Sequence, residues 1–479
     1  IDRAHMMIIG KYFESIEDFM SIEMVNKKYK GMTGKYKYNP IPLNDVKIWK
    51  IFSKIETQHL YCDDDSVWKS RRIKQYVYWY PMSYTDYMTK KKNEIYKCVE
   101  YSAEDRLFYQ RYADIPEGVN VIGDECLMNC AMTSMTIPSY VTEISRKCFY
   151  KCSYLKSISI PPSVGVIGNE CYHSCILLTS LVLPESVSVI GDGCFSYCSS
   201  LSSISIPSSV SVIDNMCFYY CKSLSSLTIP SSVSAFGDEC FWGCSSLLSI
   251  SLPSSLQIIG DKCFNSCESL SSISIPPSVS VIGNGCFTFC ESLLSISLPT
   301  SVSTISDKCF SGCLSLSSIF IPSSVSKFGN SCFFNCTSLS SISIPYSVVV
   351  IGDKCFDECT NLTNVMIDPN NIHFLMEDGV LFNKEKDRII RYIPSNKRTS
   401  YSIPSSVCVL NDHCFTGCHS LLSISIPSSV SEIGEECFSR CTTLSFITIS
   451  SRFRTLVDEL FHESTGEGRM PQECQITYE

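Results

Sequence analysis

The chain has 479 residues, 30 cysteines and a formal net charge of −9. The charge is unevenly divided, because residues 1–114 carry 20 Lys and Arg against 16 Asp and Glu, whereas the remainder carries 19 against 32. This balance does not favour a nucleic-acid-binding protein, and no apolar run reaches the ~18 residues that a membrane span needs.

Residues 1–114 are expected to form a small, mostly helical head. Ser15 and Asp18 provide a capping-box-like start for one helix, and Ser102 caps another short helix. Residues 76–80 are aromatic and β-branched and precede Pro81, which favours a strand. The many tyrosines and Lys90–Lys92 are compatible with stacking on nucleic acid, but a packed domain with a charged surface is the simpler interpretation.

One 23-residue motif recurs from residue 115 to residue 449, as in IPSSVSVIDNMCFYYCKSLSSLTI at 206–229. A fixed period of this length predicts a solenoid, in which each unit covers its neighbour. The segment V-x-V-I-G-D carries a glycine in nine of 13 units, as at Gly191 and Gly260, which indicates a tight turn. The segment C-F-x-x-C-x-x-L is expected to form one or two helical turns. Both cysteines and the aromatic residue would then face inward, and the two residues between them outward.

Each unit also contains a short strand, S-I-S-I. Strand alternation places Ile204 and Ile206 in the core and Ser203 and Ser205 toward solvent. Stacking of the units then predicts a hydroxyl ladder. Its members are Ser203, Ser226, Ser249, Ser272, Ser295, Ser318 and Ser341.

The unit IPSSVSxIGDxCFxxCxSLxSISIP resembles the Treponema-type leucine-rich repeat of the BspA-like family, found in surface proteins of bacteria and of anaerobic protozoa. The resemblance implies an α/β solenoid, a leucine-rich repeat array of 23-residue units with a parallel β-sheet. The head resembles the segment that precedes such arrays in amoebal members. The predicted domains are the head (1–114), the array (115–449) and a degenerate capping repeat (450–479).

One unit, at about residues 368–403, is similar to the hairpin-containing variant of the same family. Asp378 and Gly379 would form its two-residue turn. The array departs from the family at the first cysteine of each unit, where alanine is common.

Of the 30 cysteines, 26 form 13 C-x3-C pairs in phase with the repeat. Disulfides within a pair would distort a helix, disulfides between units would require export, and zinc sites prefer other spacings with a second pair. Buried thiols are favoured because Leu460 and Ser464 take the two cysteine places in the degenerate last unit. The expected structural thiols include Cys194, Cys198, Cys217, Cys221, Cys240, Cys244, Cys263 and Cys267.

No catalytic constellation is apparent, because the seven histidines are scattered and no phosphate loop or dinucleotide fingerprint occurs. The set His413, Cys414, Cys418 and His419 is not expected to bind metal, since His413 should face water. We therefore expect a non-enzymatic scaffold without metal or cofactor that binds a protein partner and no nucleic acid.

The resemblance implies adhesion or host-matrix recognition. The alternative is an intracellular adaptor, whose head is faintly similar to an F-box at Ile9, Phe13 and Phe19 and recruits a complex while the array binds a client. With no signal peptide or prenylation box in the sequence, a cytoplasmic or non-classically surface-associated location is expected.

Variation between units concentrates at the two outward positions of C-F-x-x-C. Aromatic rings there form a candidate protein-binding patch, with Phe289 and Phe334 further along. Its residues are Tyr150, His173, Tyr197, Tyr219, Tyr220 and Trp242. Two interpretations stay open: the rings anchor a partner, or they pack on neighbouring units as an outer core layer.

Overall fold

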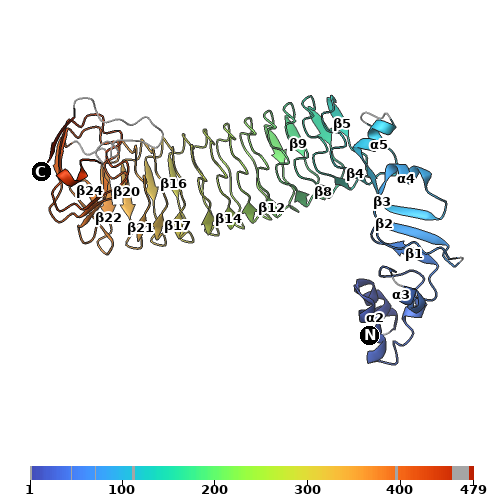
Figure 1. Cartoon of the computed structure of the whole chain (residues 1–479). Helices are drawn as coiled ribbons and strands as arrows, with labels where there is room; N and C mark the ends of the chain where they lie inside the picture. Colours follow the sequence, from blue (N-terminus) through green and yellow to red (C-terminus); the bar gives the residue numbers. More distant parts are fainter. Residues whose placement is uncertain are drawn as a thin grey trace.

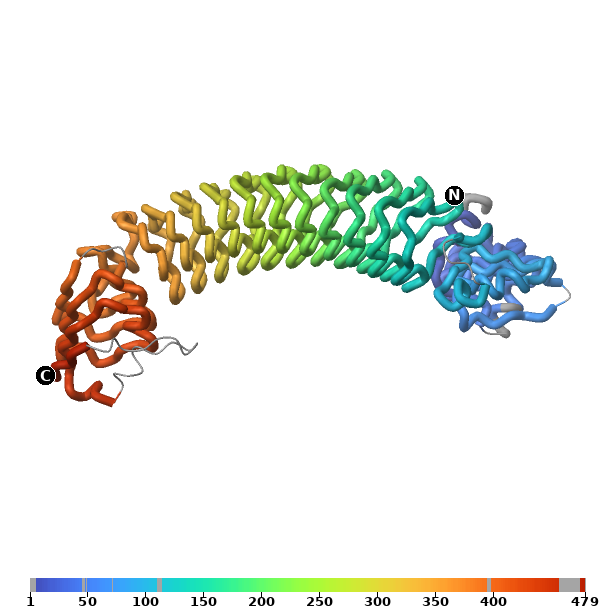
Figure 2. The backbone as a smooth tube through the Cα atoms, turned by 90° about the horizontal axis from the view of Figure 1, so that it is seen from above, coloured from blue at the N-terminus to red at the C-terminus, as the bar shows by residue number. Residues whose placement is uncertain are grey.

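The computed structural model describes residues 3–44, 46–70, 72–109, 114–393, 398–455 and 474–478. The array is a long rod with the head at one end (Figure 1). Seen from above, the rod curves gently and its last repeats turn away from its line (Figure 2). The predicted solenoid of 23-residue units with parallel strands is thereby confirmed, whereas Leu460 and Ser464 lie outside the described residues.

The first column of strands carries the serine motif. Ser203 pairs with Ser180 and Ser295 with Ser318, so equivalent residues of successive repeats lie side by side. Along each strand the isoleucine is buried and its serine neighbours are exposed, because successive side chains point to opposite faces. The strands are β5 (Ser134–Thr136), β7 (Ser157–Ser159), β9 (Ser180–Val182), β11 (Ser203–Ser205), β16 (Ser295–Ser297), β18 (Ser318–Phe320), β20 (Ser341–Ile344), β22 (Asn364–Ile367), β26 (Ser400–Ser402), β28 (Ser423–Ser425), β30 (Phe446–Ile449) and β31 (Gln475–Tyr478).

A second column of strands forms at the V-I dipeptide of each unit, which the sequence analysis did not anticipate. Its outer residue is largely exposed and its inner residue buried, as at Val281 and Ile282. The strands are β4 (Val121–Ile122), β6 (Glu143–Ile144), β8 (Val166–Ile167), β10 (Val189–Ile190), β12 (Val212–Ile213), β13 (Ala235–Phe236), β14 (Ile258–Ile259), β15 (Val281–Ile282), β17 (Thr304–Ile305), β19 (Lys327–Phe328), β21 (Val350–Ile351), β27 (Val409–Leu410) and β29 (Glu432–Ile433).

The head joins the array through this second column. Strands β1 (Thr57–Leu60), β2 (Gln75–Ser83) and β3 (Glu94–Tyr101) pair in parallel with one another and then with β4. A continuous sheet therefore crosses the domain boundary placed at residue 114, and that boundary stays a prediction. The strand expected at residues 76–80 is confirmed within β2.

The helices belong mainly to the head, which has its own core around Phe19 and Phe52. Capping boxes at Ser15 and Ser102 start α2 and α5, as predicted. The helices are α1 (Arg3–Ile9), α2 (Ile16–Val25), α3 (Val46–Ile51), α4 (Tyr84–Thr89) and α5 (Ala103–Phe108), with 3-10 turns η1 (Gly10–Tyr12), η2 (Thr33–Lys35) and η3 (Ser451–Phe453). Among the described residues, none of the helices has the length and apolar character to cross a membrane.

The helical turns predicted at C-F-x-x-C are wrong. In all 13 units, the residue before the first cysteine and the residue before the second have positive φ, from 48° to 72°. We call this segment, from the residue before the first cysteine to the second cysteine, the cysteine turn. The left-handed residues are the first and the fifth of the turn, and an α-helix does not accommodate residues with positive φ at these places.

The left-handed residues of the cysteine turn direct backbone N–H groups along the rod. The amides of Glu239, Phe241 and Gly243 donate to carbonyls of the next repeat at 2.7–2.8 Å, whereas those of Trp242 and Cys244 bond within the turn. In an α-helix, these amides would instead donate to carbonyl groups within the same helix. The cysteine turn therefore bonds each repeat to the next with three backbone hydrogen bonds.

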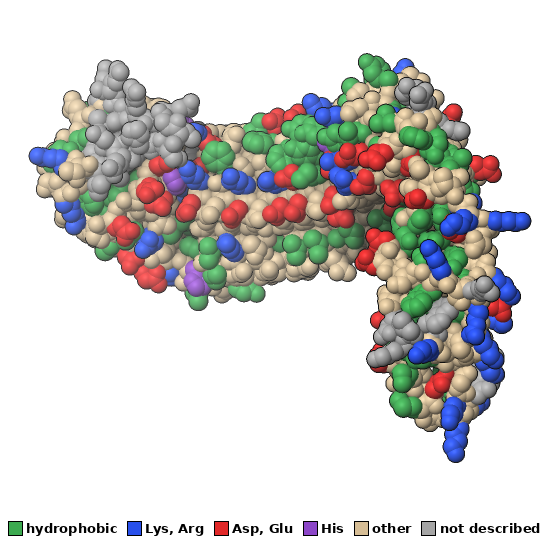
Figure 3. All heavy atoms as spheres, turned by 45° about the vertical axis from the view of Figure 1, so that its right-hand side comes forward, with side chains coloured by type: hydrophobic (Ala, Val, Ile, Leu, Met, Phe, Trp, Pro, Cys, Tyr) green, Lys and Arg blue, Asp and Glu red, His purple; other side chains and the backbone are tan. Residues whose placement is uncertain are grey.

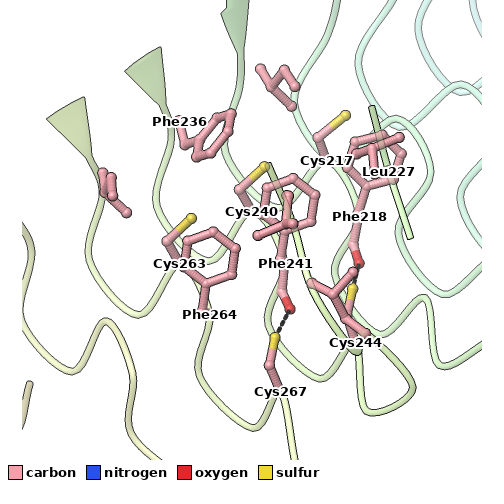
Figure 4. Close-up of a cluster of buried hydrophobic side chains, with 14 of the residues drawn as sticks. Cys217, Phe218, Leu227, Phe236, Cys240, Phe241, Cys244, Cys263, Phe264 and Cys267 are labelled. Carbon is pink, nitrogen blue, oxygen red and sulfur yellow. Dashed lines mark hydrogen bonds between the residues drawn. The ribbon is translucent and has the colours of Figure 1, made fainter. Parts of the chain in front are cut away.

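Aromatic rings stack inside the rod at the third position of the cysteine turn, directly after the first cysteine. Ten residues from Phe149 to Phe356 form a ladder of near-parallel rings with centroids 5.2–5.9 Å apart. Burial of each ring stabilises the fold by roughly 1.5–3 kcal/mol. Figure 4 shows part of this ladder, with Phe218, Phe241 and Phe264 beside the cysteines.

The second cysteine of each turn is a hydrogen-bond donor and not only an apolar filler. The Cys267 thiol donates to the Phe241 carbonyl at 3.3 Å, and the Cys244 thiol donates to the Phe218 carbonyl at 3.2 Å (Figure 4). Eleven repeats make this contact, at 3.0–3.3 Å. The thiol thus links neighbouring repeats within the core.

The glycine of V-I-G-D was predicted to suit a tight turn, and in the structure it lies shortly before the cysteine turn, without positive φ. Gly260 has an ordinary φ, but a Cβ atom there would lie 2.6 Å from the Gly237 carbonyl carbon. The next residue, Asp261, donates its amide to the Asp238 carboxylate at 2.7 Å. Glycine is thus used where the backbones of two repeats approach closely.

A hairpin unit interrupts the stack near its C-terminal end. Strands β23 (Phe374–Glu377), β24 (Val380–Asn383) and β25 (Arg388–Tyr392) are antiparallel, and Asp378 and Gly379 form the predicted turn with φ of 54° and 79°. Strand β25 then pairs in parallel with β27 and starts a second core. We call this junction, where the rod bends, the corner.

The left-handed positions give a test of the cysteine turn. Met216 has φ of 52° and a largely exposed side chain, so Met216→Gly relieves a strain of about 1–2 kcal/mol and should keep or raise the melting temperature. A helix would instead lose about 1 kcal/mol with glycine. Thermal unfolding followed by circular dichroism checks the sign.

The matched control for Met216→Gly is Ser223→Gly in the same repeat. Ser223 is exposed and does not have positive φ, so glycine should lower the melting temperature there. A similar drop for both variants would contradict the left-handed turn.

Candidate functional site

The two residues between the aromatic ring and the second cysteine of each turn were expected to face outward. The second of them is at least partly exposed unless it is glycine, whereas the first is buried in seven of the 13 units, as at Ser196, Asn265 and Thr288. Because both cysteines and the intervening ring face inward, these two positions form two parallel columns, which we call the turn face. Figure 3 shows charged side chains running in rows along the rod, with hydrophobic side chains beside them. This face carries most of the variation between repeats.

Six residues of the turn face form a continuous aromatic strip, which spans five consecutive repeats. Its members are the candidates from the sequence: Tyr150, His173, Tyr197, Tyr219, Tyr220 and Trp242. Ring centroids are 4.7 Å apart for Tyr150 and His173, 5.2 Å for His173 and Tyr197, and 5.4 Å for Tyr197 and Tyr220. Tyr219 joins Tyr220 at 4.8 Å and Trp242 at 5.6 Å. The structure therefore brings all six candidates together.

The rings support one another and remain partly open to solvent. Tyr197 is 42% exposed, and the other five are half-buried. Partial burial raises the pKa of Tyr219 to about 12 and lowers the pKa of His173, so both side chains are neutral at physiological pH. The strip is thus an uncharged, preformed surface.

Lysines frame the rings of the strip. The ammonium groups of Lys151, Lys222 and Lys262 lie 5.3, 5.6 and 5.1 Å from the ring centroids of Tyr150, Tyr220 and Trp242. Such contacts are worth about 0.5–1 kcal/mol at exposed sites. They hold the rings and place positive charge at the rim.

A groove continues the strip toward the corner. It has a volume of about 970 Å³ and begins at Tyr220 and Trp242. Its middle contains Phe289, which is 49% exposed, and its far end is closed by Glu436 and Arg440 of the C-terminal repeats. We call it the turn groove.

Ion pairs close the corner. Arg391 and Asp357 are buried and lie 2.8 Å apart, and Arg391 also donates to the Thr416 carbonyl at 2.8 Å. Burial raises the pKa of Asp357 to about 6, although the charge of Arg391 opposes the shift. Arg440 and Glu358 form a further pair across the corner, at 3.2 Å.

The predicted structural thiols are all fully buried. They are Cys194, Cys198, Cys217, Cys221, Cys240, Cys244, Cys263 and Cys267. Burial raises the pKa of the Cys240 thiol to about 11, so it stays protonated and is a poor nucleophile and metal ligand at physiological pH.

His413 does not face water as expected. Its side chain is 13% exposed and lies 3.5 Å from Glu436, because the C-terminal repeats pack at the corner. His419 instead contacts Thr442 at 3.3 Å. The described residues contain no group of three or more His, Cys, Asp or Glu side chains arranged to hold a metal.

The serine ladder is exposed but uniform. Six of its seven members are exposed, and a shallow depression of about 740 Å³ lies between Ser249 and Pro299. Identical hydroxyls in successive repeats offer little to distinguish one partner from another. The turn face is therefore the better candidate site.

A comparison with models of protein families shows which family the chain belongs to. The model of the BspA type leucine rich repeat region matches residues 106–177, 165–293, 257–378 and 393–475, which is most of the chain. The chain belongs to the BspA-type leucine-rich repeat family.

The chain is also similar to two bacterial leucine-rich repeat proteins of solved structure. The chain is 25% identical to a leucine-rich repeat protein from Bacteroides ovatus, over 77% of this chain and 97% of that one, with a TM-score of 0.47. It is 28% identical to a leucine rich cell surface protein from Faecalibacterium prausnitzii, over 56% and 68%, with a TM-score of 0.46. No curated protein matches the sequence.

The turn groove of this BspA-type array was not predicted from the sequence. Its walls come from rings that stand two repeats apart, so only the spacing along the rod shows that Phe289 and Phe334 belong to one surface. The sequence does contain a signal for this groove, because charged and uncharged pairs alternate before the first cysteine of successive repeats. The charged pairs are Asp261-Lys262, Asp307-Lys308 and Asp353-Lys354, and the uncharged ones are Asn284-Gly285 and Asn330-Ser331. The corner, by contrast, depends on contacts between distant repeats.

The raised pKa of Asp357 predicts a pH dependence of stability. The folded protein holds this proton up to about pH 6, above the ordinary value near 3.8, so the stabilisation is present at low pH and lost as pH rises through that window. Relative to Asp357→Asn, the free energy of unfolding of the wild type should fall between about pH 4 and 6, by at most about 1.4 kcal/mol per unit. Melting curves of both proteins measure it. A difference that grows with pH would contradict the assignment.

Proposed function

We propose that the chain is a non-enzymatic protein-binding scaffold whose aromatic strip anchors the partner. The observation that supports it is the continuous run of half-exposed rings from Tyr150 to Trp242 on one face of the rod. The BspA-type family, to which the array belongs, consists of repeat scaffolds, and an elongated surface suits protein partners.

The rings of the aromatic strip are held in place before a partner binds. Each ring of the strip is held by neighbouring rings or by a lysine, so binding immobilises few additional rotamers. Tyrosine and tryptophan supply large contact areas with a polar edge, which is why they dominate interface energetics. The surrounding lysines add charge at the rim, where it steers association.

The strip is tested by alanine substitution at its centre. Trp242→Ala and Tyr219→Ala should each weaken binding by roughly tenfold or more, because interface aromatics are common hot spots. Partners are captured from cells on immobilised wild-type protein, identified by mass spectrometry, purified and titrated by biolayer interferometry.

Tyr154→Ala is the matched control, since Tyr154 is 60% exposed and lies outside the strip. Its binding should equal that of the wild type. Unchanged binding by the strip variants, together with lowered melting temperatures, would assign the rings to core packing.

The family resemblance supports a more specific proposal about the kind of protein partner. BspA-like surface proteins imply adhesion or host-matrix recognition, and the head resembles the segment of amoebal members. On this proposal the strip would contact a host or matrix protein.

A second candidate is an adaptor whose head recruits a complex. Exposed apolar side chains on α1, η1 and α2 favour it, and we refer to them together as the head patch. They are Ile8, Ile9, Tyr12, Met20, Met24 and Val25. Co-purification of a Skp1-like protein with the full chain, and its loss in Met24→Asp, would support this role. Retention of the partner in Met24→Asp would remove the head patch from consideration.

A further inference from the structure

The surface around the turn groove repeats every two repeats rather than every one. Lys262 and Lys308 precede the first cysteine in alternate repeats, with Gly285 between them. The aromatic residues of the turn face occur in the intervening repeats. They are Trp242, Phe289 and Phe334.

Small side chains separate these rings. Asn265 and Ser266 lie between Trp242 and Phe289, and Ser311 lies between Phe289 and Phe334. The Phe289 ring covers Gly312, because a Cβ atom on that glycine would lie 2.5 Å from the ring. The groove is thus a series of two gaps between three rings. Each gap has a lysine at its rim, Lys262 at the first and Lys308 at the second.

The spacing of the gaps follows from the aromatic ladder beneath them. Ring centroids from Phe241 to Phe333 are 5.3–5.7 Å apart, so two repeats advance by about 11 Å. An α-helix has a pitch of about 5.4 Å and places residues seven apart on one face about 10.5 Å apart. One helical turn therefore matches one repeat, and one heptad matches the spacing of the gaps.

Other polypeptide conformations fit less well. In a β-strand the residues on one face are about 6.8 Å or about 13.5 Å apart, and a polyproline II helix repeats after about 9.3 Å. Across the single interval of about 11 Å between the gaps, these spacings are off by roughly 2.5 Å and 1.7 Å, whereas a heptad is off by roughly 0.5 Å. Sugar stacking is also disfavoured at Trp242, because Lys262 lies over its ring and Tyr219 packs against it.

The charge at the second gap indicates which kind of side chain a ligand in the groove would place there. Within the described part of the chain no carboxylate pairs with the Lys308 ammonium, whereas Lys262 is already paired with Glu239 at 3.1 Å. Lys308 is exposed at the rim, so an acidic residue of a ligand in the groove would complete the pair.

We propose that the turn groove binds an amphipathic α-helix of a partner protein, laid along the rod. Two apolar residues seven positions apart enter the two gaps, and an acidic residue pairs with Lys308. This inference rests on the proposed protein-binding function and names the partner's recognition element. Helices in grooves are commonly bound through such evenly spaced anchors.

The test uses the full chain and three synthetic peptides of three heptads each, measured by fluorescence anisotropy. One is an amphipathic helix with leucine at the a and d positions and glutamate at e, the second is its scramble, and the third is proline-rich. The helix should bind saturably, gain helicity in circular dichroism, and bind roughly tenfold more tightly than the others. No saturable binding of the helix, or preferential binding of the proline-rich peptide, would overturn the proposal.

Gap-filling variants localise the site. Asn265→Trp and Ser311→Phe place rings where Trp242 and Phe334 stand in neighbouring repeats, so the fold has a precedent for them. Each should weaken helix binding by roughly tenfold. Met128→Phe, at the same position of the first repeat and outside the groove, should have no effect. Equal binding by all three variants would contradict the assignment.

Charge exchange tests the role of Lys308. Lys308→Glu should weaken binding of the helix, and a peptide with lysine in place of its glutamates should restore it. Absence of this rescue would remove Lys308 from the site. If Trp242→Ala abolishes binding of a protein partner while no helical peptide binds, the proposed function stands and this inference falls.

Discussion

The structure depends on the hydrogen bonds that the cysteine turn makes between repeats. Two left-handed residues per repeat direct three amides along the rod, and the second cysteine adds a thiol donor to the carbonyl of the preceding ring. The aromatic ladder is a consequence, because rings at the same position of every turn stack at the repeat spacing. A core of sulfur, aromatic and branched side chains then runs the length of the array.

The same turn determines where function resides. Its cysteines and ring face inward, and the two positions between the ring and the second cysteine carry most of the variation between repeats. The first of them holds a partly exposed ring in some repeats and a buried polar side chain in others. Near the head these positions carry the aromatic strip. Toward the corner rings alternate with small residues, and the result is a groove closed by the C-terminal repeats.

The sequence predicted the solenoid, the exposed serine ladder and the six residues of the aromatic strip, because each follows from a fixed period. The hairpin unit departs from that period and was predicted from its similarity to a family variant. It missed the left-handed turn, since residues such as Met216 and Lys308 rarely adopt positive φ and their neighbours read as a short helix. It assigned Gly260 to a turn, because glycine serves both positive φ and close approach. The buried pair of Asp357 and Arg391 was inaccessible to sequence reasoning, since the corner joins residues that no period relates.

The most direct test of this account is a count of reactive thiols in protein purified without reductant, before and after denaturation. The account predicts that Cys62 and Cys408, which are exposed, dominate the reaction of the native protein, and that nearly all 30 cysteines react after denaturation. A large deficit after denaturation would mean that the thiols are bonded to one another. Rapid reaction of most cysteines in the native protein would mean that the cysteine turns are not buried, and either result would contradict the account.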